Sequence, residues 1–183
     1  DPISDFGLQQ LTNADDVEVI KQTGLSEEEL IAMIGEFDAL LVRSQTKVTE
    51  RIMEAGVKLK VIGRAGVGVD NIDLEAATNQ GSIVINAPDG NTITTCEHTF
   101  AMMMALARHI PQAYAKTIKG EWDRKSFLGV ELRNKTLGVF GLGRIGIEVA
   151  KRAMAFGMTI LGYDPFMSEE RATQLGIKLA TLD

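Results

Sequence analysis

Residues 135–146 have the sequence KTLGVFGLGRIG. The segment 135–140 is typical of a strand, and a helical segment follows the glycines as far as Phe156. A second strand is expected over 158–163. Strand, glycine loop, helix and second strand fall within about 30 residues, as the βαβ unit of a dinucleotide-binding fingerprint requires. The chain is therefore predicted to be an α/β protein with a parallel sheet.

The glycines in this stretch have distinct expected roles. Gly141 permits the tight turn, Gly143 lets the backbone approach a diphosphate, and Gly146 lets the helix pack closely on its strand. The free amides of the first helical turn, where Arg144 and Ile145 lie, would face the diphosphate. The Arg144 side chain could reach the diphosphate or remain a solvated helix residue. These five residues are assigned to cofactor binding.

An acidic residue, Asp164, ends the second predicted strand. A carboxylate at this position can accept both hydroxyls of the adenosine ribose and would repel a 2′-phosphate, which selects NAD over NADP. NAD is therefore the expected cofactor. The alternative is that Asp164-Pro165 is only a turn.

The first half of the chain alternates short aliphatic runs with helical segments, again as in a parallel sheet covered by helices. Buried strands are predicted at 39–42, 60–62 and 83–86. The opening strand of this part is expected upstream of Asp1, because Asp-Pro resembles the turn that follows a strand.

Several residues mark helix ends in this half. Ser26 and Glu29 have the spacing of a capping box, in which each side chain bonds the backbone amide of the other. Gly56 and Gly81 stand where left-handed helix ends are expected.

A cluster of turn residues, PDGN at 88–91, divides the chain. A long helix is predicted after it, from Thr92 to Arg108, and Pro111 suits the first turn of a second helix. Two domains are therefore predicted, 1–88 and 89–183.

Composition limits the possible partners. The chain has 183 residues, 45% of them apolar, and a net charge of −6, so nucleic acid and anionic membranes are not expected partners. No apolar run reaches the roughly 20 residues of a membrane-spanning helix. Cys96 is the only cysteine, which excludes an internal disulfide and suits a reducing compartment. A cytoplasmic location is expected.

Several motifs together resemble the D-isomer-specific 2-hydroxyacid dehydrogenases. They are LVRS at 41–44 with Lys47, GRAGVGVDNID at 63–73, INAP at 85–88, EHT at 97–99, and the stretch 137–165. The resemblance covers nearly the whole chain. It implies a flavodoxin-like substrate domain followed by the first half of a Rossmann dinucleotide-binding domain, both truncated, with the substrate between domains.

The same resemblance implies a substrate site in the first domain. The amides around Gly66, Val67 and Gly68 would hold the substrate carboxylate, with Val67 also near the nicotinamide end of NAD. Without the resemblance, this loop could be an ordinary tight turn.

Cations also lie near the predicted strand ends of the first domain. Arg43 with its neighbour Ser44, then Lys47 and Arg64, stand where ligands collect in open α/β sheets. These four residues are assigned to substrate binding, and the cations would suit a phosphorylated substrate. The alternative is that the charges are solvated surface groups.

No catalytic or metal-binding residue is predicted within this chain. His98 and His109 lie on or near the long helix beside apolar faces, so structural roles are favoured. The resemblance implies a catalytic arginine, glutamate and histidine downstream of Asp183, so residues 1–183 alone are expected to be inactive.

The resemblance implies NAD-dependent oxidation of a small anionic substrate by the full-length protein. The first hypothesis is conversion of 3-phospho-D-glycerate to 3-phosphooxypyruvate. Another D-2-hydroxyacid, such as glycerate or lactate, is the alternative, and an NAD-sensing protein similar to corepressors is a third possibility. A homodimer or homotetramer is expected. The apolar face around Met102, Met103 and Leu106 could bury against a partner or within its own chain.

Overall fold

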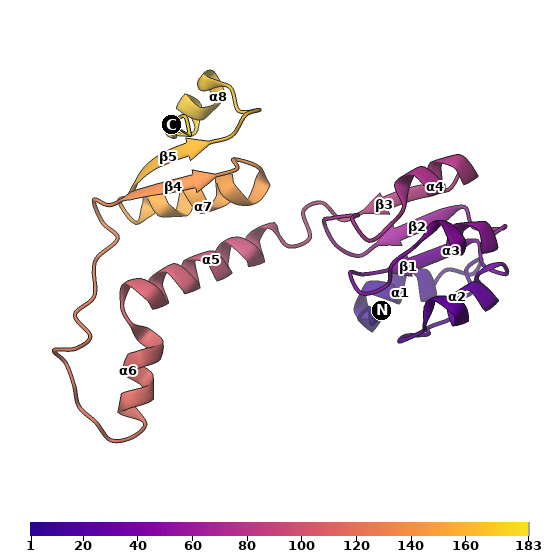
Figure 1. Ribbon diagram of the computed structural model, residues 1–183, viewed down its shortest axis with the longest axis horizontal. Helices are drawn as coiled ribbons and strands as arrows, with labels where there is room; N and C mark the ends of the chain where they lie inside the picture. The colour runs from indigo at the N-terminus through magenta and orange to yellow at the C-terminus, as the bar shows by residue number, and fades with distance from the viewer. Residues whose placement is uncertain (183) are drawn as a thin grey trace. The chain divides into compact units, whose positions relative to one another are not determined.

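The computed structural model describes residues 1–182. The chain divides into two compact units: unit 1, Asp1–Asn91, and unit 2, which begins at Thr92. Figure 1 shows one parallel sheet with its helices in each unit. The structure is therefore α/β, as predicted, whereas the division by role between substrate and cofactor stays a prediction.

Unit 1 holds the sheet β1-β2-β3, with all strands parallel. Its elements are α1 (Asp5–Thr12), α2 (Glu27–Ile34), β1 (Ala39–Val42), α3 (Glu50–Ala55), β2 (Val61–Arg64), α4 (Leu74–Gln80) and β3 (Ile83–Asn86). The first and third predicted strands are confirmed. The middle strand was predicted to end at Ile62 but continues to Arg64, because Gly63 and Arg64 stay in register with β1.

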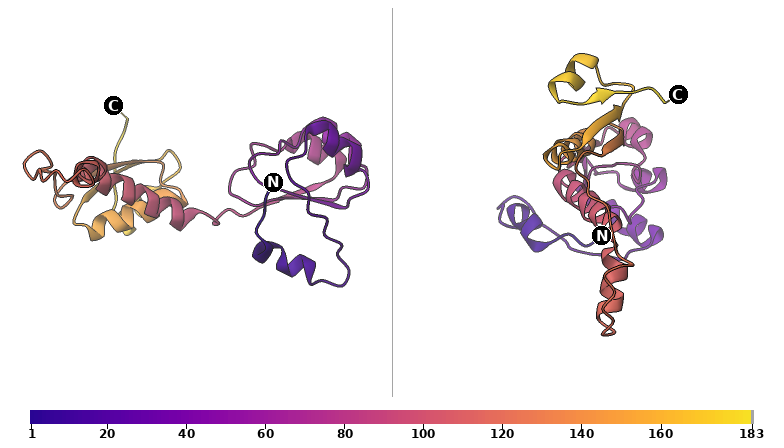
Figure 2. Two further views of the ribbon diagram at one scale, coloured as in Figure 1. Left: turned by 90° about the horizontal axis from the view of Figure 1, so that it is seen from below. Right: turned by 90° about the vertical axis from the view of Figure 1, so that its left-hand side faces the viewer.

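The core of unit 1 lies between the sheet and helices α2, α3 and α4, which gather on one side of it (Figure 2). Val42 and Ile62 point into this core and are buried. Ile83 and Ile85 are 62% and 53% exposed. The expectation that all three strands are buried is therefore wrong for β3 and only partly right for β1, where Leu41 is 38% exposed, because side chains alternate along a strand and the core lies on one face only.

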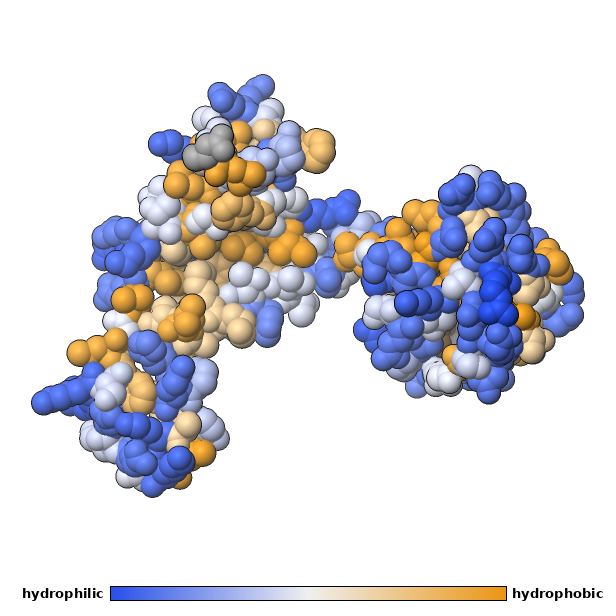
Figure 3. All heavy atoms as spheres, in the orientation of Figure 1, coloured by the Kyte–Doolittle hydropathy of each residue, from blue (hydrophilic) through white to orange (hydrophobic). Residues whose placement is uncertain are grey.

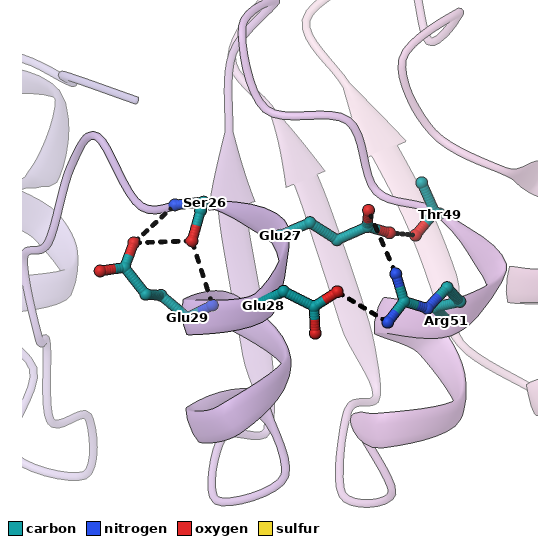
Figure 4. A network of polar contacts seen from close by, with 6 residues as sticks. All are labelled: Ser26, Glu27, Glu28, Glu29, Thr49 and Arg51. Atoms are coloured by element: carbon teal, nitrogen blue, oxygen red, sulfur yellow. Dashed lines mark hydrogen bonds and ion pairs between the residues drawn. The ribbon is translucent and has the colours of Figure 1, made fainter.

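The predicted capping box begins α2 (Figure 4). The Ser26 amide donates to Glu29 Oε2 at 2.8 Å, and the Glu29 amide donates to Ser26 Oγ at 3.3 Å. The bond from the Ser26 amide holds the pKa of the Glu29 carboxyl below its ordinary value. Arg51 on α3 pairs with Glu28 at 2.8 Å and with Glu27 at 3.6 Å, which links α3 to α2.

The two glycines at helix ends differ. Gly81 has φ of +82°, so its predicted left-handed conformation is confirmed. Gly56 has φ of −82°, so the same prediction is wrong there. A β-carbon at Gly56 would lie 3.2 Å from the Ile52 carbonyl oxygen and 3.2 Å from Leu59 Cβ. Gly56 is therefore explained by limited space rather than by backbone handedness.

Unit 2 holds the sheet β4-β5-β6, again parallel. Its elements are α5 (Thr92–Ala107), α6 (Ile110–Thr117), β4 (Thr136–Phe140), α7 (Arg144–Ala155), β5 (Thr159–Tyr163), α8 (Glu169–Gln174) and β6 (Lys178–Leu179). The long helix predicted to Arg108 ends one residue earlier. Pro111 occupies the first turn of α6, as predicted.

Helix α5 packs on α7 in the core of unit 2. The rings of Phe100 and Phe156 stack with centroids 5.3 Å apart, and Cys96 is fully buried nearby in the same core. Met103 packs against this core, whereas Met102 and Leu106 are 61% and 77% exposed. Figure 3 shows apolar side chains gathered on the visible face of unit 2.

Within residues 1–182, no helix is both long enough and apolar enough to span a bilayer.

Candidate functional site

The β4–α7 loop, residues 141–143, makes the turn that the sequence predicted. Gly141 has φ of +91°, a conformation that glycine adopts without strain, and its amide donates to the Tyr163 carbonyl at 2.7 Å. A β-carbon at Gly146 would overlap the Gly141 carbonyl oxygen and would lie 3.4 Å from Val139 Cγ1. Gly146 therefore lets α7 start directly against the end of β4.

Helix α7 begins without a side-chain cap. Its N-cap is Gly143, and a β-carbon built there would meet no atom within 4 Å. Within residues 1–182, the amides of Gly143, Ile145 and Gly146 donate to no protein acceptor. By contrast, Asp73 caps α4 by accepting from the Ala76 amide at 2.9 Å. The start of α7 thus keeps open amides and the positive end of the helix dipole, which favours an anion.

Arg144 is the first residue of α7, and it is exposed. Contact with a diphosphate stays a prediction.

Asp164 follows β5 and reaches back to the β4–α7 loop. Its Oδ2 accepts from the Leu142 amide at 2.7 Å, while its Oδ1 accepts from the Phe166 amide at 2.8 Å. The second bond is typical of an Asx turn, so the turn interpretation has support. The first bond places a carboxylate beside the open end of α7. Ribose binding by Asp164 stays a prediction that both bonds leave possible, since each oxygen retains acceptor capacity.

The β2–α4 loop, residues 65–73, contains the glycines assigned to the substrate carboxylate. The Gly66 amide already donates to the Arg64 carbonyl at 2.8 Å. Across residues 1–182, the amides of Val67 and Gly68 have no protein acceptor. An anion in this loop would therefore meet the amides of Val67 and Gly68 rather than that of Gly66. The predicted approach of Val67 to the nicotinamide remains untested.

Two predicted cations, Arg43 and Arg64, lie at the carboxyl edge of the first sheet. Val42 and Arg64 are neighbours across β1 and β2, so Arg43, which follows Val42, also lies at this edge. The Arg64 guanidinium lies over Gly66, where a β-carbon would overlap it. This contact brings a cation to the glycine loop.

The remaining predicted residues lie in the β1–α3 loop, residues 43–49. Ser44 and Lys47 are exposed there, as is Arg43. The loop therefore presents two cations and a hydroxyl to solvent close to the β2–α4 loop, to which Val48 bonds through the Asn71 carbonyl at 2.8 Å.

Sequence analysis missed three polar residues that hold these loops. Asp1 accepts from the amides of Arg43 and Thr46, and Asn71 donates to the carbonyls of the same two residues. The Asn86 side chain donates to the Val67 carbonyl at 2.6 Å. Asn71 and Asn86 belong to motifs noted in the sequence, but their partners lie 19 or more residues away along the chain, so no local pattern predicted these bonds.

The histidines lie outside these loops. His98 is exposed on α5, and His109 precedes α6 with φ of 54°. In the described part of the chain, no group of three or more His, Cys, Asp or Glu residues is arranged to hold a metal ion.

Comparisons with known proteins identify relatives of this chain. The chain is 56% identical over all 183 residues to the curated D-3-phosphoglycerate dehydrogenase of Synechocystis sp., and it spans 33% of that protein's length. It therefore covers about a third of a full-length relative.

Solved structures match both units. The D-lactate dehydrogenase of Aquifex aeolicus, complexed with NAD and lactic acid, is 31% identical with a TM-score of 0.76, over 83% of this chain and 46% of that one. An acyclic imino acid reductase, Bsp5, in complex with NADPH and D-Arg, is 28% identical with a TM-score of 0.83. The match covers 98% of this chain and 57% of that one. The D-isomer specific 2-hydroxyacid dehydrogenase family, catalytic domain, matches residues 1–180. The chain therefore belongs to this family.

Proposed function

We propose that the intact protein oxidises 3-phospho-D-glycerate to 3-phosphooxypyruvate with NAD. The observation that carries the cofactor assignment is the uncapped start of α7 beside the Asp164 carboxylate. The substrate assignment is supported by the cations at the edge of the first sheet and by the 56% identity to a D-3-phosphoglycerate dehydrogenase.

In this proposal, unit 1 is the flavodoxin-like substrate domain and unit 2 is the first half of a Rossmann domain. The parallel order β4-β5-β6, with α7 joining β4 to β5, supports the second assignment. The likeness to the solved D-lactate dehydrogenase structure of Aquifex aeolicus supports the first.

The residues of this chain would bind and orient the substrate and NAD, and NAD would be the hydride acceptor. The amides of Gly143, Ile145 and Gly146 would donate hydrogen bonds to the diphosphate, Arg144 would add a positive charge, and Asp164 would accept from the ribose hydroxyls. The amides of Val67 and Gly68 hold the substrate carboxylate. Arg43, Lys47 and Arg64, with the Ser44 hydroxyl, bind the phosphate. We assign the catalytic proton transfer to no residue of this chain, so residues 1–183 alone are expected to bind without turnover.

The test is NADH oxidation by the intact protein with 3-phosphooxypyruvate or an unphosphorylated 2-keto acid. Arg43→Ala or Lys47→Ala should raise KM for the phosphorylated substrate about tenfold, with little change for the unphosphorylated one. Lys58→Ala is the matched control, because Lys58 is exposed and pairs with Glu36 before β2, away from the carboxyl edge.

Other outcomes would replace the proposal. An equal rise in KM for both substrates in these variants, or a preference of the unsubstituted protein for the unphosphorylated acid, would indicate a glycerate or lactate dehydrogenase. Tight NAD binding without any turnover would instead favour a binding protein of the corepressor type.

A homo-oligomer is part of the same proposal. The exposed Met102 and Leu106 on α5 are suited to an interface, whereas Met103 is already packed within its own unit. Leu106→Glu should lower the mass of the intact protein in solution, as measured by light scattering. An unchanged mass would exclude α5 from the interface. The cytoplasmic location stays a prediction.

A further inference from the structure

Two side chains from distant parts of unit 1 bond the same loop. Asp1 Oδ2 accepts from the amide of Arg43 at 2.6 Å and from that of Thr46 at 3.2 Å. Asn71 Nδ2 donates to the carbonyls of Arg43 and Thr46, both at 2.7 Å. Asp1 and Asn71 therefore satisfy the backbone N–H and C=O groups of both Arg43 and Thr46. We call these two side chains the Asp1–Asn71 clamp.

The clamp acts on a segment with little other support. The β1–α3 loop leaves the sheet after Val42, so Arg43 and Thr46 have no strand partner for these groups. Further along, the loop is tied by Val48, whose amide donates to the Asn71 carbonyl at 2.8 Å. Asn71 therefore fixes this loop through both its side chain and its backbone.

The geometry also defines what each half of the clamp can do. Two carbonyl oxygens face the Asn71 side chain, so only a donor fits there, and a carboxylate would be repelled. Asn71 Oδ1 is buried without a partner in residues 1–182, so the amide is held in place despite one unsatisfied atom. Both bonds to Asp1 end on one oxygen, so an amide oxygen could replace it.

Asn71 belongs to the β2–α4 loop, whose Val67 and Gly68 amides are open, while its partners belong to the β1–α3 loop with its exposed cations. We infer that Asp1 and Asn71 are positioning residues, which set the cationic loop at a defined distance from the carboxylate-binding loop for a substrate carrying an anionic group at each end. This inference rests on the proposed function. Asp1 steadies only the cationic loop, whereas Asn71 connects the two.

Substitutions in the intact protein separate the two roles. Asp1→Ala should raise KM for 3-phosphooxypyruvate about tenfold, while kcat, the KM for NADH and the KM for an unphosphorylated 2-keto acid stay within about twofold. Asn71→Ala should raise KM for both acids. Asn79→Ala, on the exposed face of α4, is the matched control and should change none of these values.

The conservative variant Asp1→Asn gives the sharpest readout. It removes the negative charge near Arg43 but keeps an acceptor oxygen, so KM for the phosphorylated acid should stay at the unsubstituted value or fall. If Asp1 acts through its charge alone, Asp1→Asn and Asp1→Ala would behave alike, and the inference would be overturned. Unchanged KM in Asp1→Ala, or lower kcat with both acids together with a lower melting temperature, would also overturn it.

Hydrogen exchange of the peptide covering residues 43–48 provides a readout that needs no substrate. Exchange should rise in Asp1→Ala and Asn71→Ala, and not in Asp1→Asn or Asn79→Ala. If the unsubstituted protein turns over neither acid, the proposed function fails, and the exchange data alone decide whether the clamp orders this loop. If it turns over the phosphorylated acid and exchange is unchanged in Asp1→Ala, the clamp inference fails by itself.

Discussion

The two glycine-rich loops follow the same plan and use it differently. Each connects a parallel strand to a helix, but the β4–α7 loop enters its helix at once through Gly143, which leaves the first turn uncapped. The β2–α4 loop is longer, and Asp73 caps the helix that follows it. An anion on the first loop can use a helix N-terminus, whereas an anion on the second must use loop amides and side-chain cations. The difference shows that the residue at the N-cap decides which loop offers a helix end to a ligand.

The largest expected effect comes from the glycine that packs rather than the one that faces the ligand. Gly146→Ala places a methyl group against the Gly141 carbonyl and should cost about 1–3 kcal/mol of stability, with loss of NAD binding. Gly143→Ala meets no atom within 4 Å, so it should weaken NAD binding about tenfold while leaving the melting temperature nearly unchanged. Calorimetry and thermal unfolding measure both. Equal destabilisation by the two variants would mean that Gly146 is not required for packing any more than Gly143 is.

The next effect concerns the carboxylate that bonds the β4–α7 loop. Asp164→Ala removes both the acceptor for the Leu142 amide and the predicted ribose contact, so NAD affinity should fall about tenfold, while NADP binding should fall less or improve. Asp164→Asn keeps one acceptor oxygen and is the control for the loop contact. Titrations with both dinucleotides measure these affinities. An unchanged ratio of NAD affinity to NADP affinity would mean that Asp164 is a turn residue only.

A smaller effect is expected at the capped helix of unit 1. Asp73→Ala removes the bond to the Ala76 amide and should cost about 1 kcal/mol in unfolding free energy. NAD binding should not change, because this helix end is not the proposed diphosphate site. Denaturant unfolding and calorimetry test the two statements. A loss of NAD affinity in this variant would contradict the assignment of the diphosphate to α7 alone.

The smallest effect is a pH dependence in unit 2. The Lys116 ammonium, hydrogen-bonded at 2.7 Å, and Ser126 lower the pKa of Asp123 to about 2. Because this folded-state pKa is depressed, the stabilisation is present above the ordinary value of 3.8 and is lost as pH falls toward 2. At pH values above 4, Asp123→Asn should therefore cause a small decrease in the melting temperature. Near pH 2 it should cause none. A difference that persists at low pH would mean that charge pairing is not its cause.

Sequence analysis predicted the features that depend on neighbouring residues. The strand, loop and helix around Gly141, the capping box of Ser26 and the first-turn position of Pro111 follow from local backbone geometry and nearby hydrogen bonds, and all are found in the structure. Gly56 was predicted wrongly, because a glycine required by limited space has no different sequence pattern from one required by a positive φ.

The sequence by itself determined the α/β class, the order of the strands from β1 to β5, and the position of the glycine turn, because short-range sterics and periodicity decide these. Helices α1 and α8 and strand β6 were not predicted. Tertiary structure alone decided that Asp164 bonds the β4–α7 loop, that Ile83 and Ile85 stay exposed, and that Asp1 and Asn71 hold the same loop. The physical reason is that hydrogen bonds and burial depend on which distant residues folding brings together. The separation of two residues along the chain does not determine their distance in the fold.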